Sequence, residues 1–332
     1  MINIDKHKKK YLILSSIIGG CLLIISWPLK GVPLFSLISL VPFLWIIDYI
    51  EHNRDKFIGG AIFRYTYPGF LLWNALTSYW IWYATAIGSV FVILANAALM
   101  SLTLQIAFNL KKWLGSTNRI GIIYVILWIC FEYLHFNWQL SWPWLTLGNV
   151  FATMPSIIQW YEFTGVLGGT LWIWLINILI YFIIRYIYYK KYKERAFHVY
   201  VLIFVFILIT PIVYSLIRYR NIPLENDNKV KVLVLQPNLD PYEEEFNISP
   251  QDNIAIIKKL INNVNAKDVD FIVAPESNIQ EGIWEDEFDS SYSVNEIAKI
   301  LKDKYPNALY ITGASTYKAF KDGEKITSTA RY

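Results

Sequence analysis

Long apolar segments occupy about the first two thirds of the 332-residue chain. A helix that crosses the apolar core of a bilayer, about 30 Å thick, needs roughly 20 apolar residues. Only 17% of the residues are charged, against about 25% in soluble domains. The sequence predicts a polytopic α-helical membrane domain of about seven spans, near residues 11–27, 33–50, 57–81, 87–110, 120–135, 160–184 and 197–217.

The first apolar segment follows a basic leader at residues 6–10, as the apolar core of a secretory signal peptide would. No cleavage site of small residues follows, because the segment ends at Ser26-Trp27-Pro28. We therefore expect this segment to remain in the protein as a membrane span.

Basic residues are distributed unevenly among the connections between the predicted spans. The connections near residues 6–10, 54–56, 111–119 and 185–195 contain fourteen lysines and arginines, whereas those near 28–32, 82–86 and 136–159 contain only Lys30. Short cytoplasmic loops are enriched in lysine and arginine, so the first set is predicted to be cytoplasmic. Seven spans then place everything after residue 215 on the extracytoplasmic face.

The connection near residues 136–159 contains Trp138, Trp142 and Trp144, with no charge between 136 and 149. An aromatic belt at the headgroup level explains this composition. The alternative is a loop that dips into the outer leaflet and lines a lipid-facing cavity. Glu132 and Glu162 lie near the outer ends of their spans, where an acid is either functional or simply solvated.

From residue 221 onward the chain has the composition of a soluble domain, so we predict a transmembrane domain over 1–220 and an extracytoplasmic domain over 221–332. Strands are expected near 230–236, 269–274 and 308–313, with an amphipathic helix capped by Ser249 and a second one near 294–301. This alternation predicts an α/β domain built from βαβ units. No glycine-rich phosphate-binding motif follows the first strand, which argues against nucleotide binding.

Several other functions are not expected. Cys21 and Cys130 lie inside apolar segments, and the four histidines are scattered, so no disulfide, metal site or cofactor is predicted. The net charge of +4 is no sign of nucleic-acid binding, because the basic residues lie between apolar segments.

Glu276 is the principal candidate for a catalytic residue. The predicted strand 269–274 ends at Pro275, and Glu276 follows immediately. A carboxylate at the end of a strand can be partly desolvated and act as an acid or base. The simpler interpretation is an exposed acid that caps a turn, because one acid is not an active site.

Motifs in both halves resemble one family. Residues 232–238 and 271–277 are similar to the opening of a nitrilase-type (carbon–nitrogen hydrolase) domain, an α-β-β-α sandwich. Together with the seven spans they resemble bacterial apolipoprotein N-acyltransferases. Residues 132–148 and 159–168 are similar to the family's segments around the fifth and sixth spans, although His135 stands where the family usually has arginine. The residue types at 240–242 and 281–284 suggest the Bacteroidetes branch of this family.

The resemblance implies an activity and its participants. It implies N-acylation of the N-terminal diacylglyceryl-cysteine of an apolipoprotein, with the sn-1 acyl chain of a membrane phospholipid as donor, at the extracytoplasmic face of the bacterial inner membrane. It also implies a Glu–Lys–Cys triad with an acyl-thioester intermediate and no cofactor. Glu276 matches the family's glutamate. The candidate substrate-binding residues are Trp142, Trp144, Asn238, Tyr242 and Trp284.

The family's lysine and cysteine have no match in this sequence. No cysteine follows Cys130, and Lys318, Lys321 and Lys325 lie in a polar turn that does not match the lysine motif. The leading expectation is therefore an incomplete, inactive acyltransferase whose nitrilase-like domain is truncated. Two alternatives are a non-catalytic membrane scaffold and a membrane-tethered amidase of the nitrilase type. The tryptophan-rich connection favours a lipid acyl donor over a soluble amide.

Overall fold

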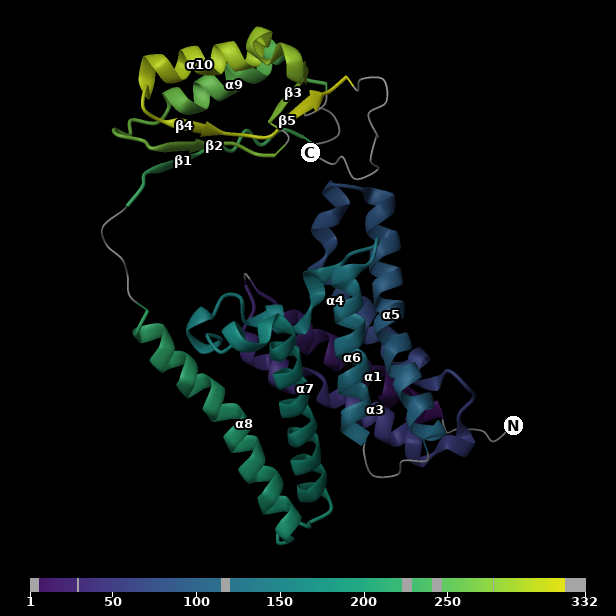
Figure 1. Ribbon diagram of the computed structural model, residues 1–332. Helices are drawn as coiled ribbons and strands as arrows, with labels where there is room; N and C mark the ends of the chain where they lie inside the picture. The colour runs from purple at the N-terminus through teal and green to yellow at the C-terminus, as the bar shows by residue number, and fades with distance from the viewer. Residues whose placement is uncertain are drawn as a thin grey trace. The chain divides into compact units, whose positions relative to one another are not determined.

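A computed structural model describes residues 6–28, 30–114, 120–222, 229–240, 247–276 and 278–319. The chain divides into two compact units, Met1–Pro223 and Leu224–Tyr332. We name them the membrane unit and the α/β unit (Figure 1).

The membrane unit is a bundle of α-helices joined by short 3₁₀ turns (Figure 1). Its helices are α1 Lys6–Ser26, α2 Ser36–Ser39, α3 Val41–His52, α4 Ala61–Thr77, α5 Ala86–Trp113, α6 Ile120–Asn137, α7 Tyr161–Tyr188 and α8 Arg195–Arg220. The 3₁₀ turns are η1 Pro33–Phe35, η2 Arg54–Lys56, η3 Tyr79–Tyr83, η4 Pro143–Leu145, η5 Leu147–Phe151 and η6 Pro155–Ile157.

The prediction of a multi-pass membrane domain is confirmed, although not every predicted span has the same length. Among the residues that the structure describes, five segments are long and apolar enough to cross a membrane: Lys8–Ser26, Pro33–His52, Ala86–Trp113, Tyr161–Tyr188 and Arg195–Arg220. The other two predicted spans are shorter helices, α4 with 17 residues and α6 with 18. Within α4, Arg64 and Pro68 interrupt the apolar sequence.

Small residues allow α1 and α4 to cross closely. A Cβ on Gly20 would overlap the backbone of Gly69, and a Cβ on Gly69 would overlap the backbone of Ser16. The Ser16 hydroxyl accepts a hydrogen bond from Gly69 N (2.8 Å) and donates one to Thr66 O (3.1 Å). Close backbone packing at small residues is a common way for membrane helices to associate.

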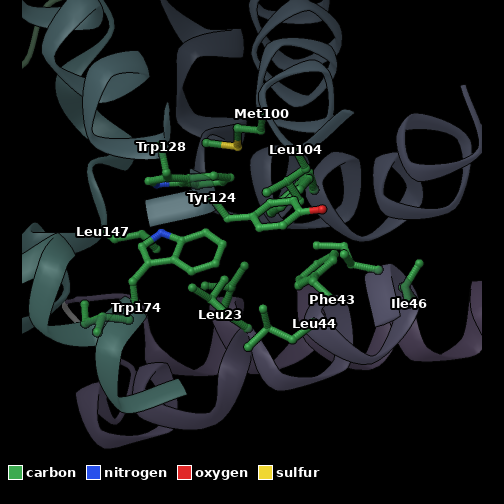
Figure 2. Close-up of a cluster of buried hydrophobic side chains, with 14 of the residues drawn as sticks. Leu23, Phe43, Leu44, Ile46, Met100, Leu104, Tyr124, Trp128, Leu147 and Trp174 are labelled. Carbon is green, nitrogen blue, oxygen red and sulfur yellow. The ribbon is translucent and has the colours of Figure 1, made fainter. Parts of the chain in front are cut away.

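The core of the membrane unit is aromatic. Figure 2 shows Trp128 of α6 with Met100 of α5 on one side and Trp174 of α7 on the other, and the two indole centroids are 5.5 Å apart. Phe43 of α3 stacks on Phe70 of α4 with centroids 4.5 Å apart. These contacts join α3 through α7 in one buried cluster.

Ion pairs link basic residues near the ends of α5 and α7 to acids of α3. The buried ammonium of Lys111 on α5 pairs with Glu51 on α3, and Arg185 on α7 pairs with Asp48 on α3 at 3.1 Å. Basic residues from three of the connections predicted to share one side of the membrane, Arg54, Lys111 and Arg185, therefore meet at the end of α3.

The α/β unit contains two small parallel sheets. Its elements are β1 Val232–Val234, α9 Pro250–Asn262, β2 Phe271–Val273, β3 Ile279–Trp284, η7 Glu285–Ser290, α10 Tyr292–Lys304, β4 Leu309–Ile311 and β5 Ala314–Tyr317. One sheet has the order β1-β2-β4, and the other pairs β3 with β5. Helices α9 and α10 lie on one face of the three-stranded sheet (Figure 1). The predicted βαβ units are confirmed, whereas the α-β-β-α sandwich of a nitrilase-like domain stays a prediction.

Candidate functional site

The carboxyl ends of β1, β2 and β4 form one edge of the three-stranded sheet. Asn238 follows β1, Glu276 follows β2 and Gly313 follows β4. Open α/β sheets bind their ligands outside the carboxyl ends of the parallel strands. Both predicted site residues at this edge, Asn238 and Glu276, are exposed. Asn238 also has a positive φ of 58°, which asparagine tolerates better than most residues.

The backbone of Glu276 is fixed by the segment after β4. Ala274 N donates to Ile311 O (2.9 Å), Gly313 N donates to Pro275 O (3.3 Å), and Ile279 N donates to Gly313 O (3.3 Å). A Cβ on Gly313 would overlap the carbonyl group of Glu276, so this approach requires glycine. The carboxylate is thus presented to solvent from a firmly bonded backbone. The sequence analysis did not identify a role for Gly313, whose signal was a glycine at the end of the predicted strand 308–313.

The residue two positions beyond Glu276 is anchored in the interior. Asn278 is 6% exposed and its amide donates to the Tyr310 hydroxyl (3.2 Å). Its carbonyl accepts a hydrogen bond from Asn253 of α9. Burial raises the pKa of Tyr310 to about 12, despite hydrogen bonds that act in the opposite direction. The neutral phenol therefore persists as a partner at any physiological pH.

A second acid near Glu276 in the sequence has a structural role. The Glu281 carboxylate accepts hydrogen bonds from Tyr292 N (2.9 Å), Ser293 N (2.7 Å) and the Ser291 hydroxyl (2.8 Å). It therefore caps the N-terminus of α10, where backbone N–H groups favour a negative charge. Burial acts to raise the pKa of Glu281, but these hydrogen bonds outweigh it and hold the pKa below its usual range.

Two other predicted site residues do not join Glu276 in the described geometry. Trp284 ends β3, about 16 Å along the strand from Ile279 at roughly 3.3 Å per residue. Its exposed ring packs on Tyr317 with centroids 5.5 Å apart. Tyr242 lies outside the described residues. Their roles in substrate binding stay predictions.

In the membrane unit, Glu132 holds the tryptophan-rich connection in place. Its carboxylate is buried and accepts hydrogen bonds from Trp128 Nε1 (2.9 Å), Leu147 N (2.9 Å) and the Thr170 hydroxyl (2.6 Å). These bonds tie η5 to both α6 and α7. Gly148 N adds a further bond to the Thr170 hydroxyl (3.0 Å). Glu132 was expected to be either functional or simply solvated. Its geometry favours a role in positioning the tryptophan-rich connection over simple solvation.

Glu162 has a different environment. It is exposed at the start of α7, accepts a hydrogen bond from the Tyr214 hydroxyl and lies 3.4 Å from Arg218 of α8. This acid links α7 to α8 at the surface of the membrane unit.

Of the two predicted site tryptophans in this connection, Trp144 lines a large cavity. Trp142 is half-buried and is not among the residues that line it. The ring of Trp144 packs edge-on against Trp80, with centroids 5.6 Å apart. Both line a cavity of about 760 Å³, together with the end of α4 at Leu76 and the segment after α1 that contains Trp27 and Lys30. Two of the three connections predicted to share the low-charge side, those near 28–32 and 136–159, thus contribute residues to the cavity. The geometry supports the interpretation in which this loop lines a cavity.

These features define a class: a multi-pass membrane protein that continues into an α/β unit with an acid at the carboxyl edge of a parallel sheet. Residues 19–179 match the sequence profile of the apolipoprotein N-acyltransferase N-terminal domain. The membrane unit is therefore similar to this domain, and the resemblance to apolipoprotein N-acyltransferases is confirmed.

Curated relatives have the same name. The apolipoprotein N-acyltransferase of Chlorobaculum tepidum is 26% identical over 271 residues, which are 79% of this chain and 48% of the relative. That bacterium belongs to the Bacteroidetes–Chlorobi group. The enzyme of Geobacter metallireducens is 25% identical over 323 residues, 94% of this chain and 58% of the relative. The chain thus spans about half the length of the curated relatives it matches.

Proposed function

We propose that the protein is an apolipoprotein N-acyltransferase that moves the sn-1 acyl chain of a phospholipid to the free amine of a diacylglyceryl-cysteine. The observation that carries this proposal is the exposed Glu276 at the carboxyl edge of a parallel sheet, in a chain whose membrane unit matches the family's N-terminal domain. The names of both relatives support the same activity.

In the proposed reaction Glu276 is the general base. It takes the proton of a cysteine thiol, the thiolate attacks the ester carbonyl, and the acyl-thioester forms as the lysophospholipid alkoxide leaves and receives that proton. The acceptor amine then attacks the thioester, loses its proton to Glu276 and releases the thiolate. A lysine would stabilise the oxyanion. Neither the lysine nor the cysteine of the triad is assigned to a residue among the 332, whose only cysteines are Cys21 and Cys130.

The proposed site lies at the extracytoplasmic face of the bacterial inner membrane. Both substrates are held in the outer leaflet by their acyl chains, so a carboxylate at that surface would meet them without extracting either one from the bilayer. The low-charge connections and the aromatic cavity of the membrane unit support this placement.

Glu276→Gln tests the proposed role. The gene that encodes these residues, with its native downstream sequence, is expressed in a bacterium depleted of its own N-acyltransferase. Mass spectrometry of a reporter lipoprotein then measures the fraction with a third acyl chain. We expect the substitution to reduce transfer at least about 100-fold, the scale of a general-base contribution.

The matched control is Glu287→Gln, which changes another exposed acid of the α/β unit. It should retain transfer. Near-normal transfer by Glu276→Gln would remove Glu276 from the mechanism, and no third acyl chain with the unsubstituted gene would contradict the proposed activity itself. Sequencing downstream of codon 332 shows in addition whether a lysine motif and a cysteine follow.

A further inference from the structure

The cavity beside Trp144 has an apolar wall and one basic residue. Its wall is formed by Ile24 and Ile25 of α1, Leu76 of α4 and the rings of Trp80 and Trp144. Lys30 lies in the turn that follows α1 and is exposed. The lining therefore combines surface suited to a hydrocarbon chain with a single positive charge.

The turn that presents Lys30 is fixed by hydrogen bonds. Gly31 N donates to Trp27 O (3.1 Å), and Val32 N donates to Ile25 O (2.8 Å). A Cβ on Gly31 would overlap the carbonyl oxygens of Trp27 and Ile25, so the tight return of the chain depends on this glycine. Lys30 is consequently held at the cavity on a bonded turn.

The charge of Lys30 is not used inside the membrane unit. Lys111, Arg185 and Arg218 each pair with a carboxylate, whereas no ion pair of Lys30 is found among the residues that the structure describes. The cavity lining also contains no aspartate or glutamate. An ammonium group in this cavity would therefore find no opposite charge in the lining, but a phosphate would find Lys30.

We propose that this cavity binds a phospholipid with a net negative headgroup, with an acyl chain on the apolar wall and the phosphate at Lys30. A lysine near an anionic membrane surface contributes about 1 kcal/mol, which corresponds to about a five-fold change in affinity. The binding does not require Glu276 or acyl transfer, so the proposal is independent of the proposed activity.

Lipid titration of the purified, delipidated chain in detergent tests the proposal. Native mass spectrometry measures apparent dissociation constants for phosphatidylglycerol and for phosphatidylethanolamine with identical acyl chains. We expect phosphatidylglycerol to bind about five-fold more tightly. Lys30→Gln should abolish this difference and Lys30→Arg should preserve it, while Leu76→Trp, which fills the cavity, should weaken the binding of both lipids.

Lys56→Gln is the matched control, because Lys56 is exposed in η2 and does not line the cavity. Equal affinity for the two lipids in the unsubstituted protein, or an undiminished preference in Lys30→Gln, would overturn the proposal. So would a synthetic diacylglyceryl-cysteine peptide that displaces phosphatidylglycerol from both the unsubstituted protein and Lys30→Gln, since the cavity would then take the acceptor lipid. Circular dichroism confirms that each variant is folded.

Discussion

At the scale of single residues, Glu132 is an acid of the membrane unit that joins three elements. One buried carboxylate accepts hydrogen bonds from an indole, a backbone N–H and a hydroxyl that come from three different elements. A buried donor that loses its acceptor costs about 1–3 kcal/mol. The position of the tryptophan-rich connection therefore depends on this side chain more than on any contact of the exposed Trp144.

Glu132→Ala should lower the stability of the membrane unit. The substitution leaves Trp128 Nε1 and Leu147 N without their acceptor, and we expect a loss of about 2 kcal/mol, the lower part of the range for two such groups. The measurement is the midpoint of thermal unfolding in detergent. Glu162→Ala, which breaks an exposed pair with Arg218, is the control and should change the midpoint much less. Equal shifts for the two variants would contradict the positioning role of Glu132.

Residue roles were predictable where the chemistry is local. The position of Glu276 directly after a buried strand follows from the β-branched residues and the proline before it. The need for glycine at position 313 does not follow from the neighbouring sequence, because it arises from the carbonyl group of Glu276, 37 positions earlier in the chain. The hydrogen bond between Glu132 and Thr170 likewise joins residues 38 positions apart.

At the scale of elements, the N-terminus of α10 depends on a carboxylate from β3. Glu281 accepts from the first N–H groups of the helix, and Ser291 caps it from within the sequence. Because the folded pKa of Glu281 is depressed, its contribution to stability is present above the unfolded pKa of about 4.3 and is lost as the pH falls through the lower folded pKa.

Glu281→Gln should therefore weaken α10 at neutral pH. We expect about a five-fold loss of amide protection for residues 291–304, equivalent to about 1 kcal/mol for a helix cap. Hydrogen exchange of the full chain at pH 7 and pH 3, corrected for intrinsic rates, measures it. The difference between Glu281→Gln and the unsubstituted protein should shrink at pH 3. Glu296→Gln removes only a surface pair and serves as control. A difference that does not change with pH would show that the charge of Glu281 is not the cause.

Elements with a clear pattern were predicted well. Helix α9 starts where Ser249 and Pro250 predict it, with the Ser249 hydroxyl accepting from Asp252 N at 3.1 Å. Strands β3 and β5 were not predicted, because neither sequence alternates between apolar and polar residues. In addition, β5 is exposed throughout, and both strands follow closely on other structured segments. The predicted span near 33–50 is divided at Leu40 into α2 and α3, ahead of Pro42.

At the scale of the whole molecule, the charge of the connections and the three-dimensional contacts agree on two ends of the membrane bundle. Glu51 with Lys111 and Asp48 with Arg185 mark the basic end. The cavity near Lys30 and Trp144 joins two of the low-charge connections, those near 28–32 and 136–159, at another place in the bundle. The predicted orientation rests on the enrichment of cytoplasmic loops in lysine and arginine.

Alkaline phosphatase fusions test this orientation, because the enzyme folds only outside the cytoplasm, where its disulfides can form. A fusion after Asn221, at the end of α8, should be active. A fusion after Lys190, between α7 and α8, should be inactive. Replacing Arg185 and Lys190, the basic residues of this loop that the second fusion retains, with glutamine should reduce the contrast, since these charges favour retention of that loop in the cytoplasm. High activity after Lys190 together with low activity after Asn221 would invert the topology and place Glu276 away from the lipids that the proposed reaction consumes.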